Sequence, residues 1–123
     1  MYWFKLYVFF NVAFVTLLAL YVSKVRITER VPHGDGGKIN VKKAIRCHAN
    51  GVEHVIAFGL VVLALAIESS STLLPALVIG FTASRVIHAI GMFQVSALFR
   101  MSGATLTYLC EVVALTILGL ELL

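Results

Sequence analysis

Four apolar segments constrain what this chain can fold into more than any other feature of its sequence. They cover about residues 3–23, 44–67, 73–95 and 103–122, and each approaches the ~20 apolar residues that a bilayer-crossing helix needs. Together they use nearly all of the 123 residues and leave only short connections. We therefore predict an all-α membrane protein, with one domain over residues 1–123 folded as an up-down bundle of four transmembrane helices.

The composition agrees with a membrane location and limits the partners. The chain is 60% hydrophobic and only 13% charged, and its mean hydropathy of +0.97 lies well outside the balance of soluble domains. The formal net charge of +4 is not accompanied by a recognisable nucleic-acid motif. We therefore expect anionic membrane lipids, and no nucleic acid, among its partners.

Basic residues gather at one end of the predicted bundle. Cytoplasmic connections of membrane proteins collect lysine and arginine, so the polar connection 24–43 and the short turn 96–102 are predicted to face the cytoplasm. Both termini and the connection 68–72 then face away. The basic residues at the cytoplasmic end are Lys24, Arg26, Arg30, Lys38, Lys42, Lys43, Arg46 and Arg100. Within the first connection, the string VPHGDGG predicts a tight turn, because it combines one proline with three glycines.

The cysteines and histidines do not form a disulfide or metal-binding pattern. Cys47 and Cys110 fall on different spans near the end predicted to face the reducing cytoplasm, so both are expected to be free thiols. His48 and His54 are six residues apart and lie on roughly opposite sides of one helix. The pairs of Glu-x-x-His motifs that build a di-iron site in a helix bundle are missing. We predict no metal.

Polar residues open the second span and share one face of it. At about 100° per residue, Arg46, Asn50 and Glu53 fall at about 0°, about 40° and about −20°. His54 lies at about 80°, on the flank of this stripe. The stripe therefore faces one place at the cytoplasmic mouth of the bundle.

Further ionisable residues lie inside the third and fourth spans. Arg85 and His88 are three residues apart and share a helix face, and Glu111 falls at about the same depth as Arg85. An unpaired charge at that depth costs at least ~2.5–3.5 kcal/mol, so paired charges that face the interior are preferred. We predict that Arg85 pairs with Glu53, Glu111 or both. Such a pairing could serve structure alone by fixing how the helices pack.

The residue types of the stripe limit its chemistry. No serine has the setting of a hydrolase nucleophile, so a Ser-His-Asp triad is excluded. What remains is an arginine-rich pocket that also offers the amide of Asn50 and the carboxylate of Glu53. These groups suit a small anionic ligand that also carries an ammonium group.

At these residues the sequence resembles the membrane-associated proteins in eicosanoid and glutathione metabolism, the MAPEG family. The resemblance rests on Arg46-x-x-x-Asn50-x-x-Glu53 within the string RCHANGVEH, at the start of the second of four helices. The string RVPHGDGG after the first helix is similar to a bacterial inner-membrane branch of that family. The likeness extends over essentially the entire chain.

The resemblance implies a homotrimer that binds glutathione as a co-substrate between subunits, at the cytoplasmic face. It implies a transferase or peroxidase that acts on lipophilic electrophiles or lipid hydroperoxides, in which Arg26 or Arg30 stabilises the glutathione thiolate. The glutathione-binding residues that it implies are Arg46, Asn50, Glu53, His54, His88 and Arg100. Arg85 and Glu111 are then structural charges within the membrane.

Two alternatives stay open. Met92 stands where ligand-binding relatives carry a tyrosine, and Ile27 stands where one relative has a second arginine, which favours a protein of the same fold that binds a lipid or ligand without catalysis. A small multidrug exporter is the other alternative, since such proteins also combine four short helices with a membrane-embedded glutamate. Those exporters usually carry the acid in the first span, where this chain has none.

Overall fold

The protein consists of four long helices arranged as a bundle. The computed structural model describes residues 1–68 and 72–123, and within them there is no strand. The helices are α1 (Tyr2–Glu29), α2 (Ile39–Glu68), α3 (Leu74–Phe93) and α4 (Ala97–Glu121). Each is long and apolar enough to cross a membrane. The predicted all-α class with four membrane-spanning helices is confirmed.

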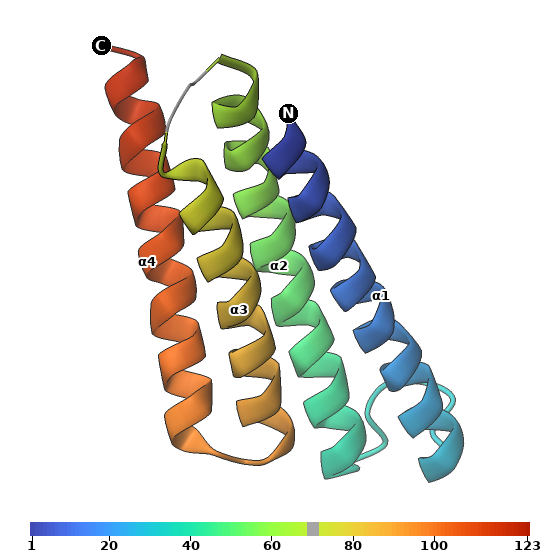
Figure 1. Ribbon diagram of the computed structural model, residues 1–123. Coiled ribbons are helices and arrows are strands. Elements are labelled where there is room, and N and C mark those ends of the chain that lie inside the picture. The colour runs from blue at the N-terminus through green and yellow to red at the C-terminus, as the bar shows by residue number, and fades with distance from the viewer. Residues whose placement is uncertain (69–71) are drawn as a thin grey trace.

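Successive helices run in opposite directions, which confirms the up-down order. Figure 1 shows the α1–α2 connection and the α3–α4 turn at one end of the bundle, and both termini at the other. We call the first of these the loop end, defined by residues 30–38 and 94–96. The helices follow one another across the view in the order α4, α3, α2, α1, and the most extensive packing joins α3 to α4 and α1 to α2. The predicted connection at 68–72 lies mostly outside the described residues.

The helices at the loop end extend well beyond the apolar segments. The segment 24–43 was predicted as a loop, but α1 continues to Glu29 and α2 already begins at Ile39. This prediction was wrong because hydropathy detects where a helix meets lipid, whereas lysine and arginine continue a helix readily once their charged ends reach water. In the same way α4 begins at Ala97, with Ser96 as its N-cap, so Arg100 lies on a helix.

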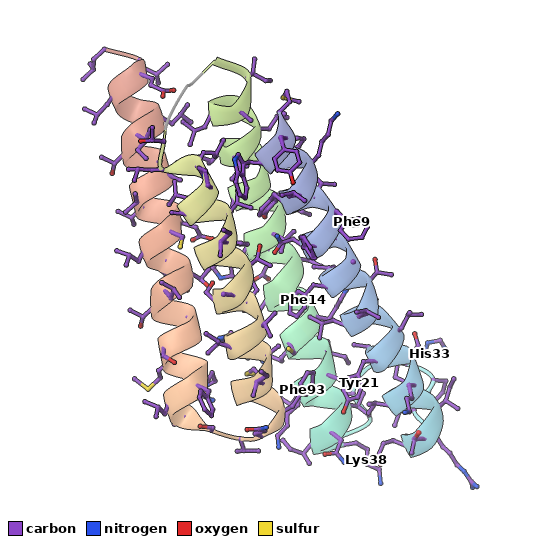
Figure 2. All side chains as sticks on the ribbon, in the orientation of Figure 1. Phe9, Phe14, Tyr21, His33, Lys38 and Phe93 are labelled. Atoms are coloured by element: carbon purple, nitrogen blue, oxygen red, sulfur yellow. The ribbon has the colours of Figure 1, made fainter. Side chains whose placement is uncertain are left out.

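The short connection that remains is a tight turn, as predicted. Arg30 ends α1 in the left-handed conformation, with φ of 56°. Gly34, Gly36 and Gly37 also have positive φ, which glycine adopts without strain. The backbone N–H of Gly37 donates to Asp35 Oδ1 at 3.0 Å. In Figure 2 His33 and Lys38 lie at this end of the bundle, at the base of α1 and α2.

An aromatic core joins three helices in the half of the bundle away from the loop end. The rings of Phe58 on α2 and Phe81 on α3 stack with centroids 4.1 Å apart, and Tyr7 of α1 lies against both. The Tyr7 hydroxyl donates to the carbonyl of Val55 at 2.6 Å. By contrast Phe9 is 68% exposed and points away from the bundle in Figure 2, as expected of a side chain that faces lipid.

Two glycines let α3 and α4 approach each other closely at the loop end. A Cβ atom on Gly103 would lie 2.5 Å from the backbone nitrogen of His88, and one on Gly91 would collide with the backbone of Arg100. Contacts this short leave no room for any side chain. The glycines therefore fix how His88 sits relative to the first turns of α4.

Candidate functional site

A pocket between α2 and α3 collects most of the polar stripe predicted from the sequence. Its volume is about 270 Å³. Arg46, Asn50 and Glu53 of α2 line it together with His88 of α3, so the fold brings four of the predicted ligand-binding residues to one place. The full lining is Arg46, Ala49, Asn50, Glu53, His88 and Met92. We call this the polar pocket.

A buried arginine contacts Asn50, one of the residues that line the polar pocket. Arg85 of α3 is only 2% exposed. Its Nη2 donates to Asn50 Oδ1 at 2.6 Å, and its Nη1 donates to Thr107 Oγ1 of α4 at 3.3 Å. A guanidinium held by neutral oxygens in a low-dielectric interior keeps much of its positive field. The pocket therefore lies against a positive charge that does not itself line it.

The predicted pairing of Arg85 with Glu53 or Glu111 is wrong. Among the described residues the side-chain partner of Glu111 is His54, whose Nδ1 lies 2.7 Å from Glu111 Oε1. Glu53 is exposed, and it has no hydrogen bond or ion pair to any described residue. The reason is rotational, since Glu53 is turned by about 60° from Asn50 around the helix axis while His54 lies one turn above Asn50. Asn50 and His54 therefore face the neighbouring helices, and Glu53 faces outward.

His88 is oriented by the backbone of α4. Its Nδ1 lies 3.1 Å from the carbonyl oxygen of Arg100, and a carbonyl can only accept, so Nδ1 carries the hydrogen. The ring's Nε2 has no hydrogen-bond partner among the described residues. It is available to a ligand in the polar pocket, as an acceptor when the ring is neutral and as a donor when it is protonated.

A second, larger cavity continues the polar pocket toward the loop end. Its volume is about 560 Å³, and it shares Arg46 and Ala49 with the polar pocket. Two more cations line it, Arg26 from the last turn of α1 and Lys42 from the first turn of α2, with Asp35 as the acidic residue. Arg26 Nη1 donates to the carbonyl of Pro32 at 3.3 Å. We call this the basic mouth, and its charge favours anions.

The remaining predicted site residues lie around these cavities. Arg30 caps α1 and lines a separate hollow of about 460 Å³ beside Arg26. Arg100 is exposed in the first turn of α4, and the contact it makes with His88 comes from its backbone carbonyl. His54 lies outside the polar pocket, in its pair with Glu111, where its ring also meets the edge of Tyr108.

Sequence reasoning missed two residues of the site, and spacing could have found both. Lys42 lies four residues before Arg46 and so on the same face of α2, but the predicted helix began too late to include it. Thr107 lies four residues after Gly103 and four before Glu111, so these three share the face of α4 that meets the bundle. A four-residue repeat of small and polar side chains inside an apolar span was the available signal.

Metal ligands and thiols contribute little to the site. Within residues 1–68 and 72–123 there is no group of three or more His, Cys, Asp or Glu side chains that could hold a metal ion. Cys47 and Cys110 are free and buried, as predicted. The polar groups that line the polar pocket are the side chains of Arg46, Asn50, Glu53 and His88.

Fold and site together define a multi-pass membrane protein with a polar pocket between α2 and α3. The chain belongs to the MAPEG family, whose family model matches residues 4–120. No curated protein and no solved structure matches the sequence significantly. Membership supports a glutathione-related function in the membrane at the level of the family.

Proposed function

We propose that this protein is a membrane-bound glutathione-dependent transferase or peroxidase that acts on lipophilic electrophiles or lipid hydroperoxides. The observation that carries the proposal is the polar pocket, in which Arg46, Asn50, Glu53 and His88 meet. It opens into the basic mouth through the shared residue Arg46. Family membership supports the same class of function.

The donor and acceptor groups of the two cavities match the ionic groups of glutathione. Glutathione carries two carboxylates and one ammonium. Arg46 and Asn50 offer donors to one carboxylate, and Arg26 with Lys42 offers cations to the other. Glu53, which has no partner among the described residues, offers its carboxylate to the ammonium. His54 is the predicted ligand contact that this geometry favours least.

The chemistry requires an activated thiolate and access from the membrane. Arg26 or Arg30 would stabilise the glutathione thiolate, because a nearby cation lowers the free energy of the charged form. In the transferase reaction the thiolate sulfur bonds to an electrophilic carbon while the leaving group departs with the electron pair. In the peroxidase reaction the sulfur attacks a hydroperoxide oxygen, the O–O bond breaks, and the alkoxide takes up a proton. The glutathione sulfenic acid that remains reacts with a second glutathione: the S–S bond forms, the S–O bond breaks, and the hydroxyl leaves as water.

We further propose a homotrimer in a bacterial inner membrane, with the loop end in the cytoplasm. In the single chain Arg46, Ala49 and Glu53 are exposed on one face of α2. A charge that faces lipid is costly, so a neighbouring subunit that covers this face would complete the site. Arg100, exposed beside His88, would add a further cation there. The concentration of lysine and arginine at the loop end supports the orientation.

Turnover measured in lipid nanodiscs tests the proposed function. Purified protein is given glutathione with a generic aryl halide and, separately, with a lipid hydroperoxide. We expect activity that falls at least tenfold in Arg46→Ala and in Arg26→Ala. Lys24→Ala is the matched control, because Lys24 is an exposed cation of α1 at the same end that lines neither the polar pocket nor the basic mouth. Equal losses in all three variants would contradict a role of Arg46 and Arg26 in catalysis. Absence of activity in the unaltered protein with both substrates would contradict the proposed transferase or peroxidase.

A second candidate function is binding of an anionic ligand without catalysis. Met92 favours it, because this apolar side chain lines the polar pocket where ligand-binding relatives have a tyrosine hydroxyl. Glutathione binding that depends on Arg46, with no turnover of either substrate, would select this alternative.

A further inference from the structure

Arg85 carries a buried charge, and a role in stabilising the helix bundle does not explain why a charge is there. Burying a cation without an acid in direct contact is expensive, and apolar residues of similar size would stabilise a membrane bundle better. Among the described residues, Arg85 has only neutral oxygens as partners, from Asn50 and Thr107. Its Nε is buried without any partner. The best-formed of these contacts, at 2.6 Å, is the one to Asn50.

The contact with Arg85 decides which way the Asn50 amide points. Arginine carries donors and no acceptor, so the amide atom that meets Nη2 must be the oxygen. The amide nitrogen, with its two hydrogens, then lies on the opposite side of the group. Asn50 lines the polar pocket, and its Nδ2 is neither bonded to a described residue nor buried. Asn50 therefore presents the N–H groups of its side-chain amide to the polar pocket.

Arg85 is itself held in place from α3 and α4. Thr107 Oγ1 accepts from Arg85 Nη1 and donates to the carbonyl of Gly103 at 2.9 Å. Ser84 Oγ lies 2.8 Å from the same Thr107 oxygen. Each of these side chains is buried. The guanidinium therefore cannot follow Asn50 if the amide turns, and it also polarises the amide so that the N–H groups become stronger donors.

We propose that Arg85 is a positioning residue, which holds Asn50 with its amide oxygen inward and its N–H groups toward the polar pocket, so that the site selects a carboxylate over its neutral amide. An amide turned the other way would present an oxygen, and an oxygen repels a carboxylate. This inference rests on the proposed function for the identity of the ligand, glutathione. The orientation of Asn50 does not depend on the ligand.

The first experiment measures the orientation without any ligand. The side-chain carbonyl carbon of Asn50 is observed by NMR in protein labelled at asparagine, and its signal is assigned by its loss in Asn50→Asp. We expect the signal to shift in Arg85→Met, which removes the donor, and to return toward its original position in Arg85→Lys. Lys24→Met is the matched control, because it removes an exposed cation of α1 that lines neither the polar pocket nor the basic mouth. A signal that does not move in Arg85→Met overturns the positioning role.

The second experiment measures selectivity in nanodiscs. Binding of glutathione is compared with binding of its two monoamides, each of which replaces one carboxylate by a carboxamide. We expect the protein to prefer glutathione over one monoamide by about tenfold or more, the size of one charged hydrogen bond. That ratio should fall to about threefold or less in Arg85→Met and should recover partly in Arg85→Lys. A ratio unchanged in Arg85→Met overturns the selectivity.

Asn50→Asp separates positioning from folding. Its carboxylate can still accept from Arg85, so we expect the thermal midpoint to be at least that of the unaltered protein, while glutathione binding falls at least tenfold because the N–H donors are gone. Retained binding in this folded variant contradicts the inference. If the unaltered protein binds neither glutathione nor its monoamides, the proposed function fails and the selectivity with it, whereas the NMR signal still decides the positioning role.

Discussion

Replacing Gly103 by alanine tests whether the contact between α3 and α4 sets the geometry of the site. The added Cβ would lie 2.5 Å from the backbone nitrogen of His88 and 2.7 Å from its Cα. Backbone atoms cannot rotate away, so α4 must move outward by about 1 Å to restore ordinary contact. That shift would lengthen the bond from His88 to the Arg100 carbonyl, now 3.1 Å, and the bond from Arg85 to Thr107, now 3.3 Å.

The expected cost follows from these two effects. Overpacking a tight helix contact costs about 1–3 kcal/mol, and each weakened buried hydrogen bond costs up to about 1 kcal/mol. We therefore expect Gly103→Ala to lower the free energy of unfolding by about 1–5 kcal/mol. Glutathione binding should weaken as well, because His88 and Arg85 both depend on where α4 lies.

Unfolding in mixed micelles, followed by circular dichroism, measures the change. Gly119→Ala is the matched control on the same helix, because a Cβ there meets no atom within 4 Å. Alanine favours a helix over glycine by up to about 1 kcal/mol, so this control should be neutral or slightly stabilising. If Gly103→Ala unfolds at the same point as Gly119→Ala, the close approach of the two helices does not control the site.

Three further changes probe the polar groups. Glu53→Gln should weaken glutathione binding about tenfold, because it removes the charge that would meet the ligand's ammonium. It should leave the unfolding of the single chain unchanged, since Glu53 has no partner among the described residues. Loss of stability with normal binding would refute this. Glu111→Leu should destabilise the protein by about 1–3 kcal/mol by leaving His54 Nδ1 without its hydrogen-bond partner, and adding His54→Phe should recover part of that loss in the same unfolding assay. Tyr7→Phe removes the donor to the Val55 carbonyl and should cost about 1 kcal/mol, and a cost near zero would show that this bond contributes nothing.

The fold could be predicted largely from the sequence because a membrane imposes a simple length rule. Four apolar segments of sufficient length had to become helices, since a backbone in lipid must satisfy its own hydrogen bonds. The ends of the helices could not be predicted in this way. Hydropathy falls where a helix leaves lipid. The helix itself can continue into water, because lysine and arginine favour helical backbone, and α1 runs through Lys24 and Arg26 to Glu29.

The lining of the polar pocket was predicted in part, for a similar reason. Helical periodicity placed Arg46, Asn50 and Glu53 on one stripe, and the fold gathers them in the polar pocket with His88. Periodicity gives the direction of a residue on its own helix only. It says nothing of how far that helix is rotated toward its neighbours, so it could not tell that Arg85 meets Asn50 while Glu111 meets His54.

Three properties follow from residue order alone: four helices able to span a membrane, the end of the bundle that carries the basic residues, and the polar face of α2. These properties depend on the order of residues along single helices. The partners of Arg85 and Glu111 depend instead on how the helices pack, because glycines at 91 and 103 bring α3 and α4 into backbone contact and fix the level at which their side chains meet. Arg85 meets Thr107, which lies one helical turn before Glu111 on α4. Because of this difference in level, Arg85 contacts the Asn50 amide and not the Glu111 carboxylate.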